Sequence, residues 1–246
     1  MIGKLLNRCL KGFKAKRILD VGPGYNNFGR ISAQITGATH ITYLDNNSDV
    51  LNWQCQACQK TSILCNCLLL SLDEVGDLAK LEHSYDLILC QEILEHLHNP
   101  KYLLTNLTQL LSPNGRIIIT VPTKISERWL KFLNPSYMSD QQGGHIQEFD
   151  KQRMMELLQE SGLVPVIFIG TQPHYFIAHS WLFGSRMKVD VSTGEVKTKG
   201  IRRFVWWLLT TGSKHFFELT GFETWGRLLP RNYFIIAARS NNKAST

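Results

Sequence analysis

Residues 17–29 read RILDVGPGYNNFG, and their glycines allow a backbone turn to lie directly against a bound molecule. A short apolar run enters a tight turn at Gly22-Pro23-Gly24, and a helical pattern begins near Phe28. A strand, a glycine turn and a helix in this order let backbone amides approach a nucleotide-like ligand closely. Because glycine lacks a Cβ atom, the ligand can rest on the turn itself.

Asp45 supplies the second part of this pattern. It ends the apolar run HITYLD, about one βαβ unit downstream of the glycine turn. A carboxylate at this spacing can accept hydrogen bonds from both hydroxyls of a ribose ring. The turn and the spaced acid together predict a nucleotide-like ligand much more strongly than the glycines alone.

Apolar runs alternate with helical patterns from residue 16 to residue 170, which favours βαβ units and a mostly parallel sheet. The expected strands are residues 17–21, 40–44, 62–67, 85–90, 116–121, 164–169 and, after a gap, 232–239. The expected helices are residues 28–36, 49–60, 73–80, 100–111 and 150–161. Asn99-Pro100 and Asp150 favour helix starts, and Pro113-Asn114-Gly115 predicts a turn.

The 246 residues are 43% hydrophobic, which suits one large α/β domain or a domain with an insertion. The longest apolar stretches are far shorter than a membrane span, and the N-terminus lacks the pattern of a secretory leader. We therefore expect a cytoplasmic protein. We divide the chain into a basic N-terminal helix (residues 1–15), an α/β core (16–170), an insertion or lid (171–231) and a closing strand with a tail (232–246).

The net charge of +7 is unevenly distributed. Basic residues dominate before residue 18 and after residue 170, whereas acidic residues outnumber them in between. The expected insertion also holds four of the six tryptophans, namely Trp181, Trp206, Trp207 and Trp225. Basic, aromatic flanks suggest contact with an anionic surface, although the charge is equally explained by solubility.

Five motifs in this order resemble those of the class I S-adenosylmethionine-dependent methyltransferases, in particular the bacterial group with ubiquinone-pathway-like cores. They are ILDVGPG (18–24), LDNN (44–47), SYDLILCQEILEHLHNP (84–100), LLSPNGRIIITVP (110–122) and GGHIQEFDKQRMMELLQESGL (143–163). The resemblance covers about residues 16–170 and the final strand. It implies a doubly wound, mainly parallel seven-stranded sheet, an aromatic and basic insertion before the last strand, and S-adenosylmethionine as the cofactor.

The resemblance also implies which residues bind this cofactor: Asp20, Gly22, Gly24, Asp45, Asn46, Asp73 and Gln91. Asp20 is expected to fix the loop and the methionine amino group, or only the loop. Asp45 is expected to hold the ribose diol, with Asn46 bonding near the adenine edge. Asp73 is preferred to Asn66 as the acid that contacts adenine.

Gln91 and Glu92 follow the fourth strand at the carboxyl edge of the sheet, where open α/β sheets bind ligands. His96 and His145 are the candidate general bases, because imidazole titrates near neutral pH. For each histidine, a packing role remains an alternative. A base is needed only if the methyl acceptor arrives protonated; otherwise alignment and exclusion of water suffice.

Two features depart from the family pattern. Asn26 stands where the third glycine of the turn is usual, and asparagine tolerates left-handed backbone better than most residues. No acidic Pro-Pro-Tyr-type motif follows the fourth strand, which disfavours the enzymes that methylate nucleic-acid amino groups.

Cys55, Cys58, Cys65 and Cys67 form a CxxC and CxC cluster that could supply four thiolates to zinc. The first pair lies on an expected helix and the second on an expected strand, without the turns that usually carry zinc ligands. We therefore expect reduced, buried, apolar cysteines and no metal.

Together these features predict an S-adenosylmethionine-dependent methyltransferase acting on a small or amphipathic acceptor, lipid- or saccharide-linked. The segment RRFVWWLL (202–209) favours a lipid-like substrate and peripheral contact with the inner face of an anionic membrane; a simple lid is the alternative. An RNA methyltransferase and a non-catalytic scaffold with this fold also remain alternatives. Nucleic acid is the less favoured partner, because no recognition motif accompanies the aromatic cluster. The motifs do not fix an oligomeric state.

Overall fold

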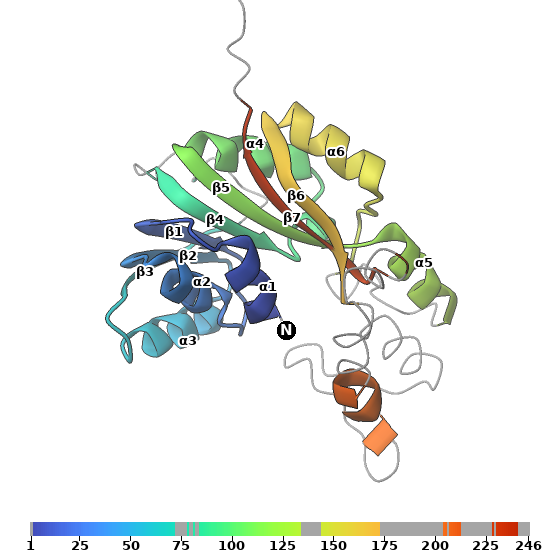
Figure 1. The fold of residues 1–246 in the computed structure, drawn as a ribbon, viewed down its shortest axis with the longest axis horizontal. Helices are drawn as coiled ribbons and strands as arrows, with labels where there is room; N and C mark the ends of the chain where they lie inside the picture. Colours follow the sequence, from blue (N-terminus) through green and yellow to red (C-terminus); the bar gives the residue numbers. More distant parts are fainter. Residues whose placement is uncertain are drawn as a thin grey trace, which may run out of the picture.

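The computed structural model describes residues 2–71, 78, 81, 84–133, 144–172, 204–205, 207–212, 228 and 230–240. In this part of the chain, seven strands form a sheet in the order β3-β2-β1-β4-β5-β7-β6 (Figure 1). They are β1 (Arg17–Val21), β2 (His40–Asp45), β3 (Leu64–Leu69), β4 (Tyr85–Gln91), β5 (Leu111–Pro122), β6 (Leu163–Thr171) and β7 (Asn232–Arg239). The first five strands are parallel, and β7 is antiparallel to both β5 and β6. The expected doubly wound, mainly parallel sheet is confirmed.

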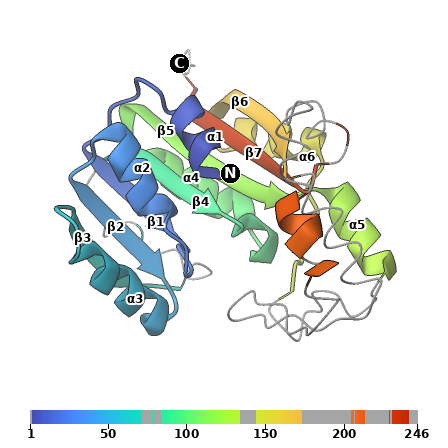
Figure 2. The ribbon, with the colours of Figure 1, turned by 60° about the horizontal axis from the view of Figure 1, so that its bottom comes forward.

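Helices cover both faces of the sheet (Figures 1 and 2). One face carries α1 (Ile2–Cys9), α2 (Phe28–Thr36) and α3 (Ser48–Cys58), and the other carries α4 (Pro100–Leu110) and α6 (Lys151–Glu160). Ile18 packs in the apolar core under α1, α2 and α3, and its neighbour Leu19 packs in the core under α4 and α6. Both side chains are fully buried. Such strands, apolar on both faces, are typical of a parallel sheet between two helical layers.

Two short elements lie beyond the carboxyl ends of the central strands. The one-turn 3-10 helix η2 (Leu94–His96) follows β4, and α5 (Lys124–Leu133) follows β5. Neither was among the expected helices. Both lie at the edge of the sheet where parallel α/β folds bind ligands.

Most expected elements have the predicted bounds to within two residues, and β1, β7 and α2 match them fully. The basic N-terminal segment expected over residues 1–15 is helical, in its described part, only at Ile2–Cys9, as α1. Apart from Leu78, the expected helix over residues 73–80 falls outside the described residues, as do Trp181, Trp206 and Trp225. Within the expected insertion, Leu208–Gly212 forms a short π-helical turn. Among the described residues, no helix combines the length and apolar character needed to cross a bilayer.

The predicted turn at Pro113-Asn114-Gly115 is wrong, because these residues lie inside β5. There the register with β4 jumps: Tyr85 pairs with Leu111, but Leu87 pairs with Arg116. The additional residues bulge out of the ladder, so turn-forming residues are accommodated without ending the strand.

Candidate functional site

The glycine turn lies between β1 and α2, at the carboxyl edge of the sheet. Gly22 has a φ of +62°, and a Cβ atom there would lie 2.1 Å from the side chain of Ile93. Gly24 also has a positive φ, +53°, but a Cβ atom there would meet nothing within 4 Å. At Gly22 both the positive φ and the contact with Ile93 therefore favour glycine, whereas Gly24 presents an open backbone surface to a ligand.

Asp20, the fourth residue of β1, is a buried acid behind this turn. Its side chain is 2% exposed, and its Oδ2 atom has no hydrogen-bond partner among the described residues. Burial raises the pKa of Asp20 to about 7, against the opposing effects of the Gly29 amide and the Arg30 charge. A buried carboxylate oxygen without a partner is rare, and a cationic group of a ligand would satisfy it.

Asp45 ends β2 and is 9% exposed. Its Oδ1 atom accepts a hydrogen bond of 2.9 Å from the Asn47 amide. Burial raises the pKa of Asp45, while the amides of Asn47, Gly24 and Asn46 lower it. These amides hold the carboxylate at the sheet edge and bring it next to Gly24, as the sequence predicts. Asn46 is exposed beside it.

Gln54 on α3 braces the glycine turn and was not among the predicted site residues. Its Nε2 atom donates to the carbonyl oxygens of Gly24 and Asn26, both at 2.8 Å. Its Oε1 atom accepts from Arg30. Gln54 is 1% exposed, and this polar side chain on the otherwise apolar buried face of α3 was the signal that could have identified it.

Asn26 does not have the left-handed backbone that its replacement of a glycine suggested. Instead its side-chain oxygen accepts a hydrogen bond of 2.9 Å from the Phe28 amide. This local bond satisfies one of the free amides at the start of α2. Asparagine at this position therefore closes the loop with its side chain.

Gln91 ends β4, is 9% exposed, and its Nε2 atom has no partner among the described residues. Asp73 lies outside the described residues. The remaining predicted cofactor residues lie at or just beyond the carboxyl ends of three neighbouring parallel strands and so share one edge of the sheet: Asp20, Gly22, Gly24, Asp45, Asn46 and Gln91.

A second group of polar side chains surrounds His145, on the far side of β4. His145 Nδ1 lies 2.6 Å from Glu127 Oε2, and Arg231 donates to Glu127 Oε1 at 2.9 Å. All three residues are less than a tenth exposed. Burial opposes ionisation of Glu127, but the hydrogen bonds from His145 and Arg231 and the positive charge of Arg231 lower its pKa.

This arrangement fixes the chemistry of the His145 ring. A carboxylate at Nδ1 favours the tautomer with its proton on that atom, so Nε2 is the basic nitrogen. The sequence identified His145 but missed Glu127 and Arg231. Glu127 lies on α5, which was not expected, and Arg231 directly precedes the last strand, more than 80 residues from His145 in the sequence.

His96 lies against His145, with ring centroids 4.8 Å apart and an interplanar angle of 76°. His96 Nδ1 is 3.3 Å from the carbonyl oxygen of Gly144. The backbone carbonyl of Glu95 accepts from the amides of Ile146 and Gln147, so η2 anchors the loop that carries His145. The structure thus brings both predicted histidines together.

Glu95 contributes a carboxyl group that is 1% exposed, with both oxygens unpartnered among the described residues. Burial, together with the nearby charges of Glu92 and Glu127, raises the pKa of Glu95 well above its ordinary value. The raised pKa favours the neutral carboxyl form, which can donate a hydrogen bond. Ligand atoms of Glu95, His96 and His145 lie within 4.8 Å of one another, a spacing that a metal ion could also bridge.

Glu92 has a left-handed backbone, with a φ of +53°. Its carboxylate accepts a hydrogen bond of 2.7 Å from Asn232, and its amide donates to the Thr120 carbonyl. A non-glycine residue in this conformation carries about 1 kcal/mol or more of strain and commonly marks a functional site. Glu92 directly follows Gln91, a predicted cofactor residue, and connects it along the chain to the segment that carries Glu95 and His96.

The cofactor-side residues fit S-adenosylmethionine. Asp20 offers an unpartnered carboxylate oxygen for an ammonium group, Gly24 an open backbone surface, and Asp45 a carboxylate for a diol. Gln91 Nε2 also has no partner among the described residues, so a polar atom of the ligand could accept a hydrogen bond from it. These residues would hold the methionine and ribose parts of the cofactor.

Comparison with known proteins agrees with this fit. A family model described as a methyltransferase domain matches residues 2–166. The curated relatives include ubiquinone biosynthesis O-methyltransferases from Citrobacter koseri, 29% identical over 119 residues, and from Rickettsia typhi, 28% identical over 115 residues. These matches cover 48% and 46% of the chain, and 48% and 44% of the relatives. The chain thus spans about half the length of the curated relatives it matches.

Solved structures share the fold. The crystal structure of an S-adenosylmethionine-dependent methyltransferase from Mesorhizobium loti is similar, with a TM-score of 0.58 and 16% sequence identity. The similarity covers 96% of both chains. At this identity the likeness concerns the fold alone.

Proposed function

The chain belongs to the methyltransferase-domain family, and we propose that it transfers a methyl group from S-adenosylmethionine to a hydroxyl oxygen of a small amphipathic acceptor. The observation that carries this proposal is the buried Glu127–His145 pair at the same sheet edge as the Gly24 turn and Asp45. A cofactor cradle and a carboxylate-supported imidazole on one edge suit methylation of a group that must first lose a proton.

S-adenosylmethionine supplies a methyl group that its sulfonium centre already activates. The protein's task is to align the acceptor and remove its proton. His145 Nε2 takes this proton, and Glu127 stabilises the imidazolium that forms. Arg231 favours the ionised form of Glu127, while the unpartnered carboxyl group of Glu95 hydrogen-bonds the acceptor next to the hydroxyl being methylated.

The names of the curated relatives support an oxygen acceptor, since they are O-methyltransferases of ubiquinone biosynthesis. We therefore test the proposal with catechols that carry an alkyl chain. Calorimetric titration should show micromolar binding of S-adenosylhomocysteine. With S-adenosylmethionine and such a catechol, S-adenosylhomocysteine should form together with one methyl ether. Absence of cofactor binding would contradict the proposal and favour the non-catalytic scaffold.

Asp20 should make cofactor binding depend on pH. With a pKa of about 7, the buried carboxyl is mostly protonated at pH 6 in the ligand-free protein and mostly ionised at pH 8. The ammonium group of the cofactor favours the ionised form, so binding at low pH must release this proton. The affinity for S-adenosylhomocysteine should therefore rise about tenfold from pH 6 to pH 8, measured by calorimetry. Asp20→Asn should flatten this rise, and an equal slope in wild type and variant would show that another group titrates.

The outer face of α5 supports a lipid-like acceptor at an anionic membrane. Ile125, Trp129 and Phe132 are spaced as one stripe along the helix and are 67%, 43% and 76% exposed. Lys124, Arg128 and Lys131 lie on the same helix. Exposed aromatic residues with adjacent basic residues are typical of helices that lie in the bilayer interface. We therefore extend the membrane contact, expected from residues 202–209, to α5.

Phe132→Asp should weaken binding to phosphatidylglycerol vesicles severalfold in a sedimentation assay, because it places a charge at the most exposed position of the apolar stripe. Met155→Asp on α6 is the matched control, since it adds the same charge at another exposed apolar position. Equal binding of the two variants would refute the role of α5.

A further inference from the structure

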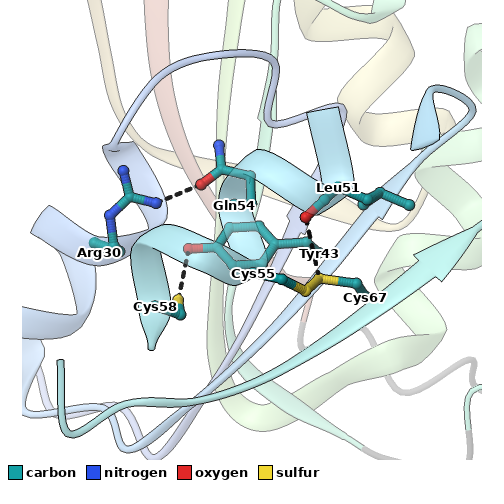
Figure 3. The surroundings of a disulfide bond; sticks show 7 residues. All are labelled: Arg30, Tyr43, Leu51, Gln54, Cys55, Cys58 and Cys67. Carbon is teal, nitrogen blue, oxygen red and sulfur yellow. Dashed lines mark hydrogen bonds between the residues drawn. A yellow bond between two sulfur atoms is a disulfide. The ribbon is translucent and has the colours of Figure 1, made fainter. Parts of the chain in front are cut away.

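The clearest difference from the sequence prediction concerns the cysteines of α3 and β3. Cys55 and Cys67 are joined in a disulfide, whereas reduced cysteines were expected (Figure 3). Cys58 is buried, as predicted, but Cys55, Cys65 and Cys67 are only partly buried. The cluster is therefore accessible to small reagents and is not only packing material.

The secondary structure brings cysteines of α3 and β3 together. Cys55 and Cys58 are three residues apart on α3 and face the same side of the helix. Cys65 and Cys67 are two residues apart on β3 and face the same side of the sheet. Sulfur atoms of Cys55, Cys65 and Cys67 lie within 4.8 Å of one another.

Cys58, one helical turn beyond Cys55, is buried, and its Sγ atom lies 3.6 Å from Tyr43 Oη. Cys67 Sγ is 3.6 Å from the Leu51 carbonyl, the position of a donor once the disulfide is reduced (Figure 3).

We propose that the three cysteines Cys55, Cys65 and Cys67, when reduced, bind a thiophilic cation such as Zn²⁺, and that the Cys55–Cys67 disulfide is the metal-free, oxidised form of this site. Thiolates are preferred ligands of Zn²⁺, which takes four ligands, so a fourth ligand would complete the site. Zn–S bonds of about 2.3 Å imply sulfur atoms about 3.8 Å apart, so the three clustered sulfur atoms need to move by only about 1 Å.

The two forms exclude each other because they use the same sulfur atoms. A dithiol reductant gives two electrons to the disulfide and becomes a cyclic disulfide, and its two protons pass to Cys55 and Cys67. Zn²⁺ then displaces the protons of the cysteine thiols. A small disulfide such as oxidised glutathione then takes two electrons from Cys55 and Cys67 and becomes two thiols, which reforms the S–S bond and expels the ion.

Either form links α3 to β3. Gln54, adjacent to Cys55, holds the Gly24 and Asn26 carbonyls of the glycine turn (Figure 3 shows its bond to Arg30). The link therefore fixes the helix that braces this turn. The proposed metal site does not depend on the methyl-transfer reaction, and its test needs no substrate.

The test is spectroscopic titration of the full chain with Co²⁺, which substitutes for Zn²⁺ and absorbs visible light in a tetrahedral thiolate site. Reduced protein, freed of reductant under nitrogen, should bind one equivalent of Co²⁺ with these bands, and Zn²⁺ should remove them. The oxidised protein should show no bands, a comparison that requires no substitution.

Cys65→Ser separates the metal site from the disulfide, because Cys65 takes no part in the S–S bond. The reduced variant should bind Co²⁺ about 100-fold more weakly, while Cys9→Ser on α1 should bind it like the wild type. Absence of the bands in reduced wild type would overturn the proposal and leave a structural disulfide. Unchanged bands in Cys65→Ser would overturn it as well.

Discussion

Asp45→Ala should weaken the binding of S-adenosylhomocysteine about 100-fold or more. The variant removes a carboxylate that would accept two charge-assisted hydrogen bonds from the ribose hydroxyls, each contributing about 1.5–3 kcal/mol. It also removes the acceptor of the Asn47 amide, which holds the start of α3. Calorimetric titration of the two proteins under the same conditions measures the difference.

Two further variants isolate the cause of this loss. Asp45→Asn preserves the shape and one acceptor oxygen, so it should lose about tenfold. Asp49→Ala removes the same charge from an exposed position in the first turn of α3 and should bind like the wild type. If Asp45→Ala binds as tightly as Asp49→Ala, the ribose acid lies elsewhere and the cofactor assignment fails.

The cofactor edge was largely predictable from the sequence because each of its parts is local. Gly22, Gly24 and Asp45 can be recognised from their residue type and their distance from an apolar run. The strands over residues 17–21 and 232–239 are short apolar segments with clear boundaries, and they form as expected. Tertiary contacts reinforce these local preferences instead of overriding them.

The histidine side was only half predictable, because its supports are distant in sequence. Glu127, His145 and Arg231 meet through α5, a loop and the residue before β7. No spacing rule connects these segments, and a glutamate on an amphipathic helix is usually exposed. The helix α5 itself was not predicted. Its apolar and polar residues alternate with helical periodicity, but it begins only two residues after the strand that ends at Pro122.

The cysteine cluster shows a different kind of failure. The spacing CxxC and CxC was noticed, but its placement on a helix and a strand argued against a shared site. The register of β3 beside β2, with Cys67 next to Tyr43, determines that Cys65 and Cys67 face α3. Register in the sheet is set by all strands together, so it was not contained in the cysteine spacing.

His145→Gln should lower the turnover of a catechol acceptor about 10²- to 10⁴-fold while leaving S-adenosylhomocysteine affinity unchanged. Glutamine retains a polar side chain but cannot act as a base at neutral pH, and general-base catalysis contributes factors of this size. Formation of S-adenosylhomocysteine at saturating cofactor and acceptor measures the rate. His98→Gln on the neighbouring exposed loop should retain the wild-type rate.

Glu127→Gln tests whether the carboxylate acts through His145. Glutamine can still hydrogen-bond both His145 and Arg231, but it no longer stabilises the imidazolium, so turnover should fall about 10²-fold or more. Because the two residues act as one unit, the double variant should be no slower than His145→Gln alone. Losses that multiply would instead show that Glu127 serves only the fold, where it neutralises the buried Arg231. A full rate in His145→Gln would mean that methyl transfer depends on alignment alone, with the acceptor already deprotonated.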